Sequence, residues 1–205
     1  MSLRAHRNED LHGNVPDTCP AVLLLIDVLN DLDFPDNAEL LKAIPALTRN
    51  IASLKKRCRD LCIPVIYVND NRDKWRSDIT AVLHHCLSSK SLGREMVEQL
   101  IPDSNDYVVL KPKHSAFYAT PLDTLISYLK SDTIIVAGLT TSACILLTAG
   151  EVYVRDLKLI VPSDCVTALH KEDHRIALDL MRANFKAETT PSQQLDLRKL
   201  IRRGR

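Results

Sequence analysis

The sequence lacks an excess of charge of either sign, and it lacks a long apolar run. Its 27 Lys and Arg residues nearly balance 26 Asp and Glu residues, which leaves a formal net charge of +1. This balance argues against a nucleic acid or a membrane surface as a partner attracted by bulk charge. No apolar run approaches the roughly 20 residues that cross a bilayer, so we expect no membrane-spanning segment.

A paired cysteine motif is also missing. The six cysteines are scattered, and none forms a C-x-x-C pair. Cys58 and Cys62 lie four residues apart on a helical pattern, but no second pair of ligands is near, so a zinc site is not expected. The first 18 residues are polar and lack the apolar centre of a secretory signal. We therefore expect a cytoplasmic protein whose thiols are reduced.

One large domain is the natural organisation of this chain. Its 205 residues are 45% hydrophobic, which is enough for a full core. No repeat, linker or change of composition divides the sequence. We expect the domain over residues 19–191, with a flexible N-terminal segment (1–18) and a basic tail (192–205). Because short terminal runs of this kind are usually solvated, the tail is not interpreted as a nucleic-acid site.

Apolar runs and helical patterns alternate along the domain. The runs expected as strands are residues 21–26, 64–69, 107–110, 133–137, 158–161 and, at a sheet edge, 187–190. The patterns expected as helices are residues 38–61, 79–86, 93–100, 122–130, 142–156 and 171–184. Regular alternation predicts an α/β protein with a mostly parallel sheet and helices on both faces.

Reactive side chains follow three of the expected strands. Asp27 follows residues 21–26 directly, and Lys111 follows residues 107–110. Cys144 lies in the first turn of the helix that comes after residues 133–137. Parallel strands end at one edge of the sheet, where ligands bind, so we expect the three side chains to converge there. The unpaired N–H groups and dipole of a helix N-terminus also stabilise a thiolate.

An acid, an amine and a thiol in contact form a coherent catalytic set. The carboxylate can take the thiol proton, return it to a leaving amine and activate a water. The ammonium lowers the pKa of both groups, and backbone N–H groups before the helix can hold an oxyanion. Each residue alone has an ordinary structural interpretation: a helix cap for Asp27, a solvated side chain for Lys111 and core packing for Cys144. Together they are much less easily explained by structure alone.

A second interpretation pairs Cys144 with a histidine, as thiol proteases do. Three histidines are available. His114 lies three residues after Lys111, and His170 and His174 share one helical face. Histidines in a loop or on a helix surface are more often solvated than catalytic. We therefore favour Asp27 as the base.

Three motifs resemble those of the isochorismatase-like cysteine hydrolases, over about residues 20–190. The first begins at Asp27 and reads D-x-x-N-D, and the second begins at Lys111 and reads K-P-x-x-S-A-F-x-x-T-x-L. The third begins at Gly138 and reads G-x-x-T-x-x-C-x-x-x-T-A. The resemblance implies a three-layer, Rossmann-like fold with a six-stranded sheet. It also implies a triad of Asp27 as general base, Lys111, and Cys144 as nucleophile.

The same resemblance implies further details of the site. It implies a cis peptide between Leu139 and Thr140, and an oxyanion hole made by the N–H groups of Thr140 and Cys144. The candidates for lining a substrate pocket are Asn30, Leu32, Phe34, Trp75, Phe117 and Tyr118. For the aromatic residues among them, ordinary core packing is an equal alternative.

The metal site of nicotinamidase-type members is matched in part. Asp70 fits the first ligand of their D-x-H pattern, and His85 fits a later histidine. Arg72 stands where the pattern has its first histidine, and arginine does not coordinate a metal at neutral pH. We therefore predict no metal, no other cofactor and no nicotinamidase activity.

The cysteine favours acyl chemistry on a small molecule. We predict a hydrolase that cleaves a C–N bond of an amide or carbamoyl compound through a thioester. One alternative is isochorismatase-type hydrolysis of a small metabolite. The other is an inactive family member that binds a metabolite or a partner protein. The resemblance also implies a homo-oligomer, usually a dimer or a tetramer.

Overall fold

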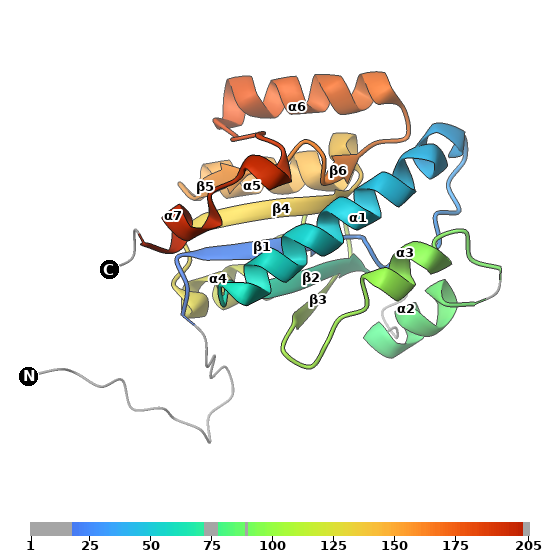
Figure 1. Ribbon diagram of the computed structural model, residues 1–205, viewed down its shortest axis with the longest axis horizontal. Helices are drawn as coiled ribbons and strands as arrows, with labels where there is room; N and C mark the ends of the chain where they lie inside the picture. Colours follow the sequence, from blue (N-terminus) through green and yellow to red (C-terminus); the bar gives the residue numbers. More distant parts are fainter. Residues whose placement is uncertain (1–17, 72–77, 89, 203–205) are drawn as a thin grey trace, which may run out of the picture.

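A parallel β-sheet lies between two layers of helices (Figure 1). The computed structural model describes residues 18–71, 78–88 and 90–202. The strands in this part of the chain are β1 (Ala21–Ile26), β2 (Val65–Asp70), β3 (Tyr107–Lys111), β4 (Thr133–Leu139), β5 (Lys158–Ile160) and β6 (Val166–Thr167). This architecture confirms the expected α/β, Rossmann-like fold.

The strand order places a crevice between β1 and β4. The sheet runs β3-β2-β1-β4-β5, and β6 also pairs with β4; every one of these pairings is parallel. From β1 the chain proceeds outward to β3 and then returns to the other side of β1 as β4. Ligands of open α/β sheets bind at such a reversal, beyond the carboxyl ends of the two strands.

The side chains of β1 explain the two helical layers. All six are buried, and they alternate between two core clusters. One cluster contains helices α1 (Ala38–Asp60), α2 (Ile79–Cys86) and α3 (Arg94–Gln99). The other contains α4 (Leu122–Leu129), α5 (Leu146–Val154) and α6 (Lys171–Phe185). A strand covered on both faces needs apolar residues at every position, which is why residues 21–26 show no polar alternation.

The prediction of an edge strand at residues 187–190 is wrong. This segment makes one isolated parallel bridge, between Glu188 and Ile160. Its hydrogen bonds join Glu188 to Leu159 and Val161, and Thr189 to Ser163, so they lie at and beyond the end of β5, which is three residues long. The sixth strand is instead β6, which pairs with Gly138 and Leu139 and continues the line of β5 along β4. Two residues are too short to show a period in the sequence.

The C-terminal segment differs from the expected loose tail. Residues 192–202 form a 3₁₀ turn (Ser192–Gln194) and helix α7 (Leu197–Arg202). Leu195 and Leu197 are buried in the cluster that contains α1. Arg57 of α1 donates hydrogen bonds to the carbonyl oxygens of Ser192 (2.6 Å) and Leu195 (2.7 Å). The tail as far as Arg202 is therefore part of the folded domain.

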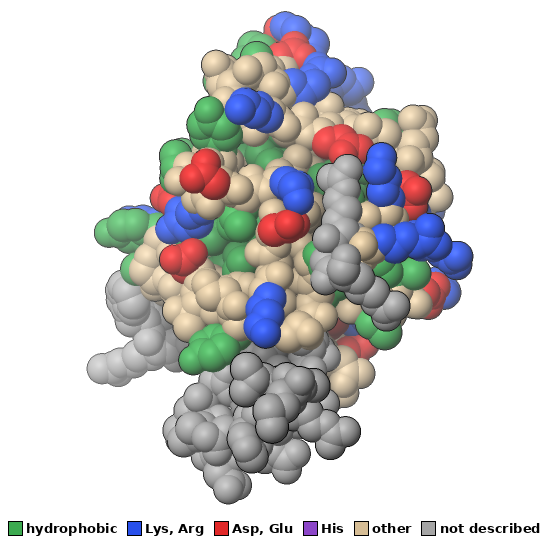
Figure 2. All heavy atoms as spheres, turned by 90° about the vertical axis from the view of Figure 1, so that its left-hand side faces the viewer, with side chains coloured by type: hydrophobic (Ala, Val, Ile, Leu, Met, Phe, Trp, Pro, Cys, Tyr) green, Lys and Arg blue, Asp and Glu red, His purple; other side chains and the backbone are tan. Residues whose placement is uncertain are grey.

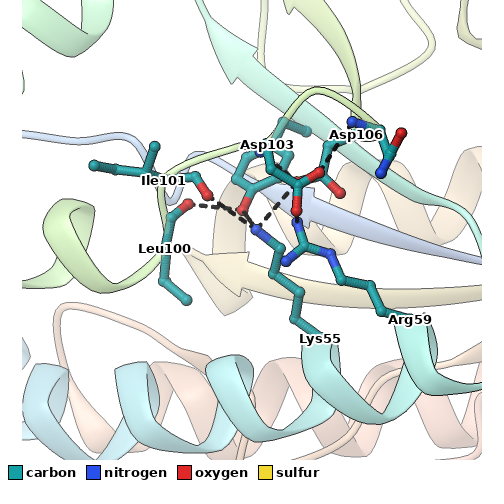
Figure 3. A network of polar contacts seen from close by, with 8 residues as sticks. Lys55, Arg59, Leu100, Ile101, Asp103 and Asp106 are labelled. Atoms are coloured by element: carbon teal, nitrogen blue, oxygen red, sulfur yellow. Dashed lines mark hydrogen bonds and ion pairs between the residues drawn. The ribbon is translucent and has the colours of Figure 1, made fainter.

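A buried polar network fixes α1 to the chain that enters β3 (Figure 3). The ammonium of Lys55 lies 3.1 Å from the carboxylate of Asp106 and donates to the carbonyl oxygen of Ile101 at 3.0 Å. Arg59, one turn later on α1, contacts both Asp103 and Asp106. Since Asp106 directly precedes β3, this network holds the amino end of that strand.

Acidic and basic side chains are interspersed on the face where β1 and β4 begin (Figure 2). This view shows no continuous patch of one sign among the side chains that it colours. Among the described residues, no helix combines the length and the apolar character that crossing a membrane requires.

Candidate active site

Asp27, Lys111 and Cys144 meet at a cleft of about 500 Å³. Asp27 follows β1, Lys111 ends β3, and Cys144 lies beyond β4, so the cleft opens at the carboxyl ends of these strands. The Lys111 ammonium lies 2.9 Å from Asp27 Oδ2 and 3.5 Å from Cys144 Sγ. The structure thus brings together the three side chains that the strand ends predicted.

Two contacts orient the carboxylate of Asp27. Its Oδ1 accepts the backbone N–H of Asp70 at 2.8 Å, and its Oδ2 faces Lys111. Its backbone is left-handed, with φ of 51°, a conformation that aspartate tolerates better than most residues. Burial raises the pKa of Asp27, and the nearby charge of Lys111 opposes this shift without cancelling it. Asp27 is therefore a stronger proton acceptor than an ordinary aspartate.

Lys111 is almost fully buried, with 1% of its surface exposed. Burial alone would lower the pKa of Lys111, but the adjacent carboxylate of Asp27 and, after it, the sulfur of Cys144 outweigh this effect, so the pKa is raised. The side chain is therefore an ammonium held between a carboxylate and a sulfur atom. It can stabilise negative charge on either of them as the proton moves.

The thiol of Cys144 is neutral in the resting protein. Burial raises the pKa of Cys144 to about 12; the Asp27 carboxylate contributes in the same direction, and Lys111 opposes it. This differs from the stabilised thiolate that a helix N-terminus suggested. Only 8% of the residue is exposed, so the loss of water around the sulfur outweighs the favourable charges.

The helix predicted over residues 142–156 begins irregularly. Residues Thr141–Ile145 form a π-helical turn that carries Cys144, and α5 follows it. The hydroxyl oxygen of Thr141 lies 2.9 Å from His174 Nδ1 of α6, which ties this turn to the outer layer. Hydrophobic periodicity does not distinguish a π turn from an α turn, so the sequence did not reveal it. Such turns occur often at functional sites.

A glycine allows β1 and β4 to approach each other beside the site. Gly138 has φ of +122° and pairs with Ile26, the residue before Asp27. A Cβ atom at Gly138 would lie 2.0 Å from the carbonyl oxygen of Ile26. The peptide bond between Leu139 and Thr140, just after this glycine, is cis, as the family resemblance implied.

Polar side chains of β2 and α5 hold the loops that carry the reactive groups. The backbone N–H of Ala116, in the loop after β3, donates to Thr148 Oγ1 of α5 at 3.0 Å. The side chain of Asn69 bonds both the N–H and the carbonyl of Leu29, each at 3.0 Å. Asn69 was not among the predicted site residues, although a polar residue at the end of an apolar run could have revealed it.

His114 lies on the open side of the sulfur atom. Its Nδ1 is 3.5 Å from Cys144 Sγ, and the residue is exposed at the wall of the cleft. Of the three histidines considered as partners for the thiol, His114 has the contact, whereas His174 bonds Thr141. His170 precedes α6 and does not line the cleft.

Four of the residues predicted at the pocket or the oxyanion hole line the cleft: Asn30, Phe34, Thr140 and Cys144. Trp75 lies outside the described residues. The cleft is also lined by residues that the sequence analysis did not select for a pocket: Leu29, Asp31, Asp33, Asn69, Asp70, Leu139, Ala143 and Leu169. Asp31 belongs to the first motif, but Leu169 had no recognisable pattern.

Leu32, Phe117 and Tyr118 do not line the cleft. The N–H of Leu32 bonds Asn30 Oδ1 at 2.7 Å in a left-handed turn, and its side chain is buried in the core. Phe117 is buried in the opposite layer, with Arg155 4.4 Å above its ring. Tyr118 is 59% exposed on the surface. The core alternative was therefore correct for Phe117.

The two residues that fit the metal pattern are Asp70 and His85, and His85 Nε2 lies 2.6 Å from Asp31 Oδ2. Within the described ranges, no group of three His, Cys, Asp or Glu residues could hold a metal ion. Arg72 lies outside those ranges. The described residues therefore do not fit the nicotinamidase-type site.

Comparisons with known proteins agree with this architecture. An isochorismatase domain model matches residues 21–194. The uncharacterized isochorismatase family protein YaaI of Bacillus subtilis (strain 168) is 34% identical over 173 residues, which cover 84% of this chain and 94% of that protein. The isochorismatase of the same organism is 32% identical over 169 residues, which cover 80% of this chain and 54% of that protein. The chain thus spans about half the length of that isochorismatase.

A solved structure shares the fold. N-carbamoylsarcosine amidase from Thermoplasma acidophilum superposes with a TM-score of 0.66 at 23% identity, covering 86% of this chain and 98% of the amidase. At this identity the likeness concerns the fold alone. The family model and the relative that matches most of this chain carry the assignment, and they show that the chain belongs to the isochorismatase family of hydrolases.

Proposed function

We propose that the protein is a cysteine hydrolase that cleaves a C–N bond of a small amide or carbamoyl compound through a thioester on Cys144. One observation carries the proposal: a single ammonium, that of Lys111, contacts both the Asp27 carboxylate (2.9 Å) and the Cys144 sulfur (3.5 Å) at the wall of an open cleft. An amidase of a carbamoyl compound has the same fold.

The first half-reaction begins with transfer of the thiol proton. The pKa of Cys144 is about 12, so attack by the sulfur requires a base beside it. Burial raises the pKa of Asp27, which makes its carboxylate a better acceptor for this proton. Asp27 then gives the proton to the departing nitrogen. Lys111 stays positive throughout and compensates the charge on the sulfur or the carboxylate.

The oxyanion of the tetrahedral intermediate needs N–H donors on the cleft side. Thr140 and Cys144 both line the cleft at the turn between β4 and α5. We assign their backbone N–H groups to this role. Backbone donors fixed in a turn stabilise the developing charge without reorganisation.

The charge of the described part of the cleft favours an uncharged or cationic substrate. Of the described residues that line it, Lys111 is the one Lys or Arg, and Asp27 already pairs with it. Asp33 adds an exposed carboxylate to the lining. The negative charge of Asp33 would repel a carboxylate group on the substrate. The cleft volume of about 500 Å³ lies within the range of small-molecule sites.

The test is a screen for ammonia release over amides, carbamoyl amino acids and ureido compounds. Cys144→Ala is the blank, and Cys62→Ala, which removes an exposed cysteine that does not line the cleft, is the matched control. We expect turnover by wild type and Cys62→Ala and none by Cys144→Ala. Turnover that survives in Cys144→Ala contradicts the proposal.

Isochorismate is the second compound to test. The match to an isochorismatase at 32% identity favours including it. That reaction needs no acyl acceptor. Hydrolysis of isochorismate that is unchanged in Cys144→Ala would therefore identify the alternative function.

A further inference from the structure

We propose that His114 is the general base of the second half-reaction, in which it takes a proton from the water that hydrolyses the thioester on Cys144. This inference rests on the proposed function. The two halves of the reaction then use different bases, Asp27 for the thiol and His114 for the water.

The sulfur atom of Cys144 has a closed side and an open side. On the closed side are Lys111 and Asp27, whose side chains are 1% and 8% exposed. On the open side is His114, an exposed residue with its Nδ1 at 3.5 Å from the sulfur. All three side chains line the same cleft, so the sulfur lies between a buried ion pair and an accessible imidazole.

The hydrolytic water must come from the open side. The amine leaves the thioester through the cleft, and water follows by the same route. Asp27 lies on the closed side of the sulfur, where its Oδ1 accepts the N–H of Asp70 and its Oδ2 faces Lys111. The carbonyl carbon of a thioester is bonded directly to the sulfur, so a water beside that carbon is within reach of His114 Nδ1. An exposed imidazole can also exchange its proton with the solvent.

The step balances with one water molecule. The water oxygen forms a bond to the thioester carbon while its proton passes to His114 Nδ1. The tetrahedral intermediate then breaks its C–S bond, and the sulfur leaves as a thiolate beside the Lys111 ammonium. His114 returns the proton to the sulfur, which restores the neutral thiol and releases a carboxylic or carbamic acid. The required tautomer carries its proton on Nε2, which leaves the lone pair of Nδ1 free to accept the proton of the water.

p-Nitrophenyl acetate separates the two halves, because its leaving group departs without a proton. Release of p-nitrophenolate measures acylation, and the later constant rate measures hydrolysis of the acetyl-thioester. In His114→Gln we expect release of about one equivalent, followed by a constant rate about 100-fold below that of wild type. Peptide mass spectrometry should then find acetyl on Cys144. Added imidazole should restore hydrolysis in His114→Ala.

Lys113→Ala is the matched control, because it changes the exposed neighbour of His114 in the same loop and is not part of the cleft. It should behave as wild type. If His114→Gln turns over as fast as this control, or slows without accumulating acetyl-Cys144, the role of His114 as deacylation base is wrong. Release of p-nitrophenolate by wild type that persists in Cys144→Ala contradicts the proposed function instead. Release of the first equivalent of p-nitrophenolate by His114→Gln also shows that this variant is folded.

Discussion

Two buried lysine–aspartate pairs lie at opposite ends of β3. Lys55 and Asp106 meet at 3.1 Å just before the strand begins, and Lys111 and Asp27 meet at 2.9 Å where it ends. The side chains of both pairs are at most 8% exposed. The same two residue types at similar burial therefore form both pairs, yet we propose a catalytic role for one of them alone.

The difference lies in the third partners. Lys55 also bonds the carbonyl of Ile101 and the hydroxyl of Tyr67, and Arg59 contacts Asp106, so the network is closed (Figure 3). Burial lowers the pKa of Lys55, and Asp106 only partly opposes it. Lys111 instead adjoins a thiol that faces a cleft, and its pKa is raised. A buried pair can take part in proton transfer when two conditions are met. A group with an exchangeable proton must contact the pair, and a ligand must have space to bind beside it.

Among changes at the two pairs, removing the carboxylate of the Lys111 pair should have the largest effect on activity. Asn tolerates the left-handed backbone of residue 27 and can still accept the N–H of Asp70. Asp27→Asn should lower turnover about 1,000-fold, because general-base assistance is lost. Steady-state kinetics measure this. Asp106→Asn is the control at the other end of β3 and should keep normal kcat; retention of most activity by Asp27→Asn would contradict a base at this position.

Breaking the Lys55 pair should affect stability instead. Asp106→Asn leaves the buried ammonium of Lys55 without its carboxylate, and loss of one partner of a buried pair costs about 3–5 kcal/mol. Urea unfolding measures this change. A loss below about 1 kcal/mol would show that the network is not a stabilising element.

The close approach of β1 and β4 can be tested at Gly138. A Cβ there lies 2.0 Å from the Ile26 carbonyl oxygen, and φ of +122° is strained for alanine. Gly138→Ala should destabilise the protein by at least about 1–3 kcal/mol and lower activity, since β1 carries Asp27 and β4 leads to Cys144. The control is Gly150→Ala in α5, where the nearest atom would be at 3.6 Å; alanine there should stabilise the helix by about 0.5–1 kcal/mol. Equal stability for both variants would contradict the tight contact.

Alkylation by iodoacetamide can test the neutral thiol, in a Cys62→Ser background that removes an exposed competitor. Burial raises the pKa of Cys144 to about 12. The alkylation rate should therefore rise about tenfold per pH unit from about pH 8 to about pH 11, because thiolate is the nucleophile. Lys111→Met removes a charge that lowers the pKa of Cys144, so its rate at a given pH should be slower. A plateau near neutral pH would show a stabilised thiolate.

The smallest expected effect concerns substrate charge. Asp33 lines the cleft and is exposed. Asp33→Lys should increase the preference for a carboxylate-bearing amide over its uncharged analogue about two- to fivefold, since exposed charge pairs contribute about 0.2–1 kcal/mol. The ratio of kcat/KM values measures this preference. Glu95→Lys, an exposed change on α3 away from the cleft, should leave the ratio as it is.

The two pairs also show what sequence can predict. Lys111 and Asp27 follow apolar strands of a parallel sheet, so topology alone places them together. Lys55 and Asp106 come from a helix and a loop, and no periodic pattern links them. The residues that line the pocket were harder to predict for the same reason. A left-handed turn at Leu32 directs its side chain into the core, and the sequence pattern does not encode that turn.

Charge balance was predicted less well than position. The helix N-terminus and Lys111, which can be read from the sequence, both lower the pKa of the thiol. Burial raises this pKa more strongly, and burial depends on how the surrounding elements pack. The contact between His114 and Cys144 likewise depends on the path of the loop after β3. These features come from tertiary packing and not from local pattern.

Acid-quenched peptide mass spectrometry during turnover tests the central claim most directly. A substrate found by ammonia release is mixed with enzyme, quenched within the first turnover and digested. The account predicts an acyl adduct on the peptide that contains Cys144, present in wild type and in Asp106→Asn and absent in Asp27→Asn. The contradicting result is release of ammonia without an acyl adduct on Cys144, both in wild type and in His114→Gln, whose adduct should be hydrolysed slowly.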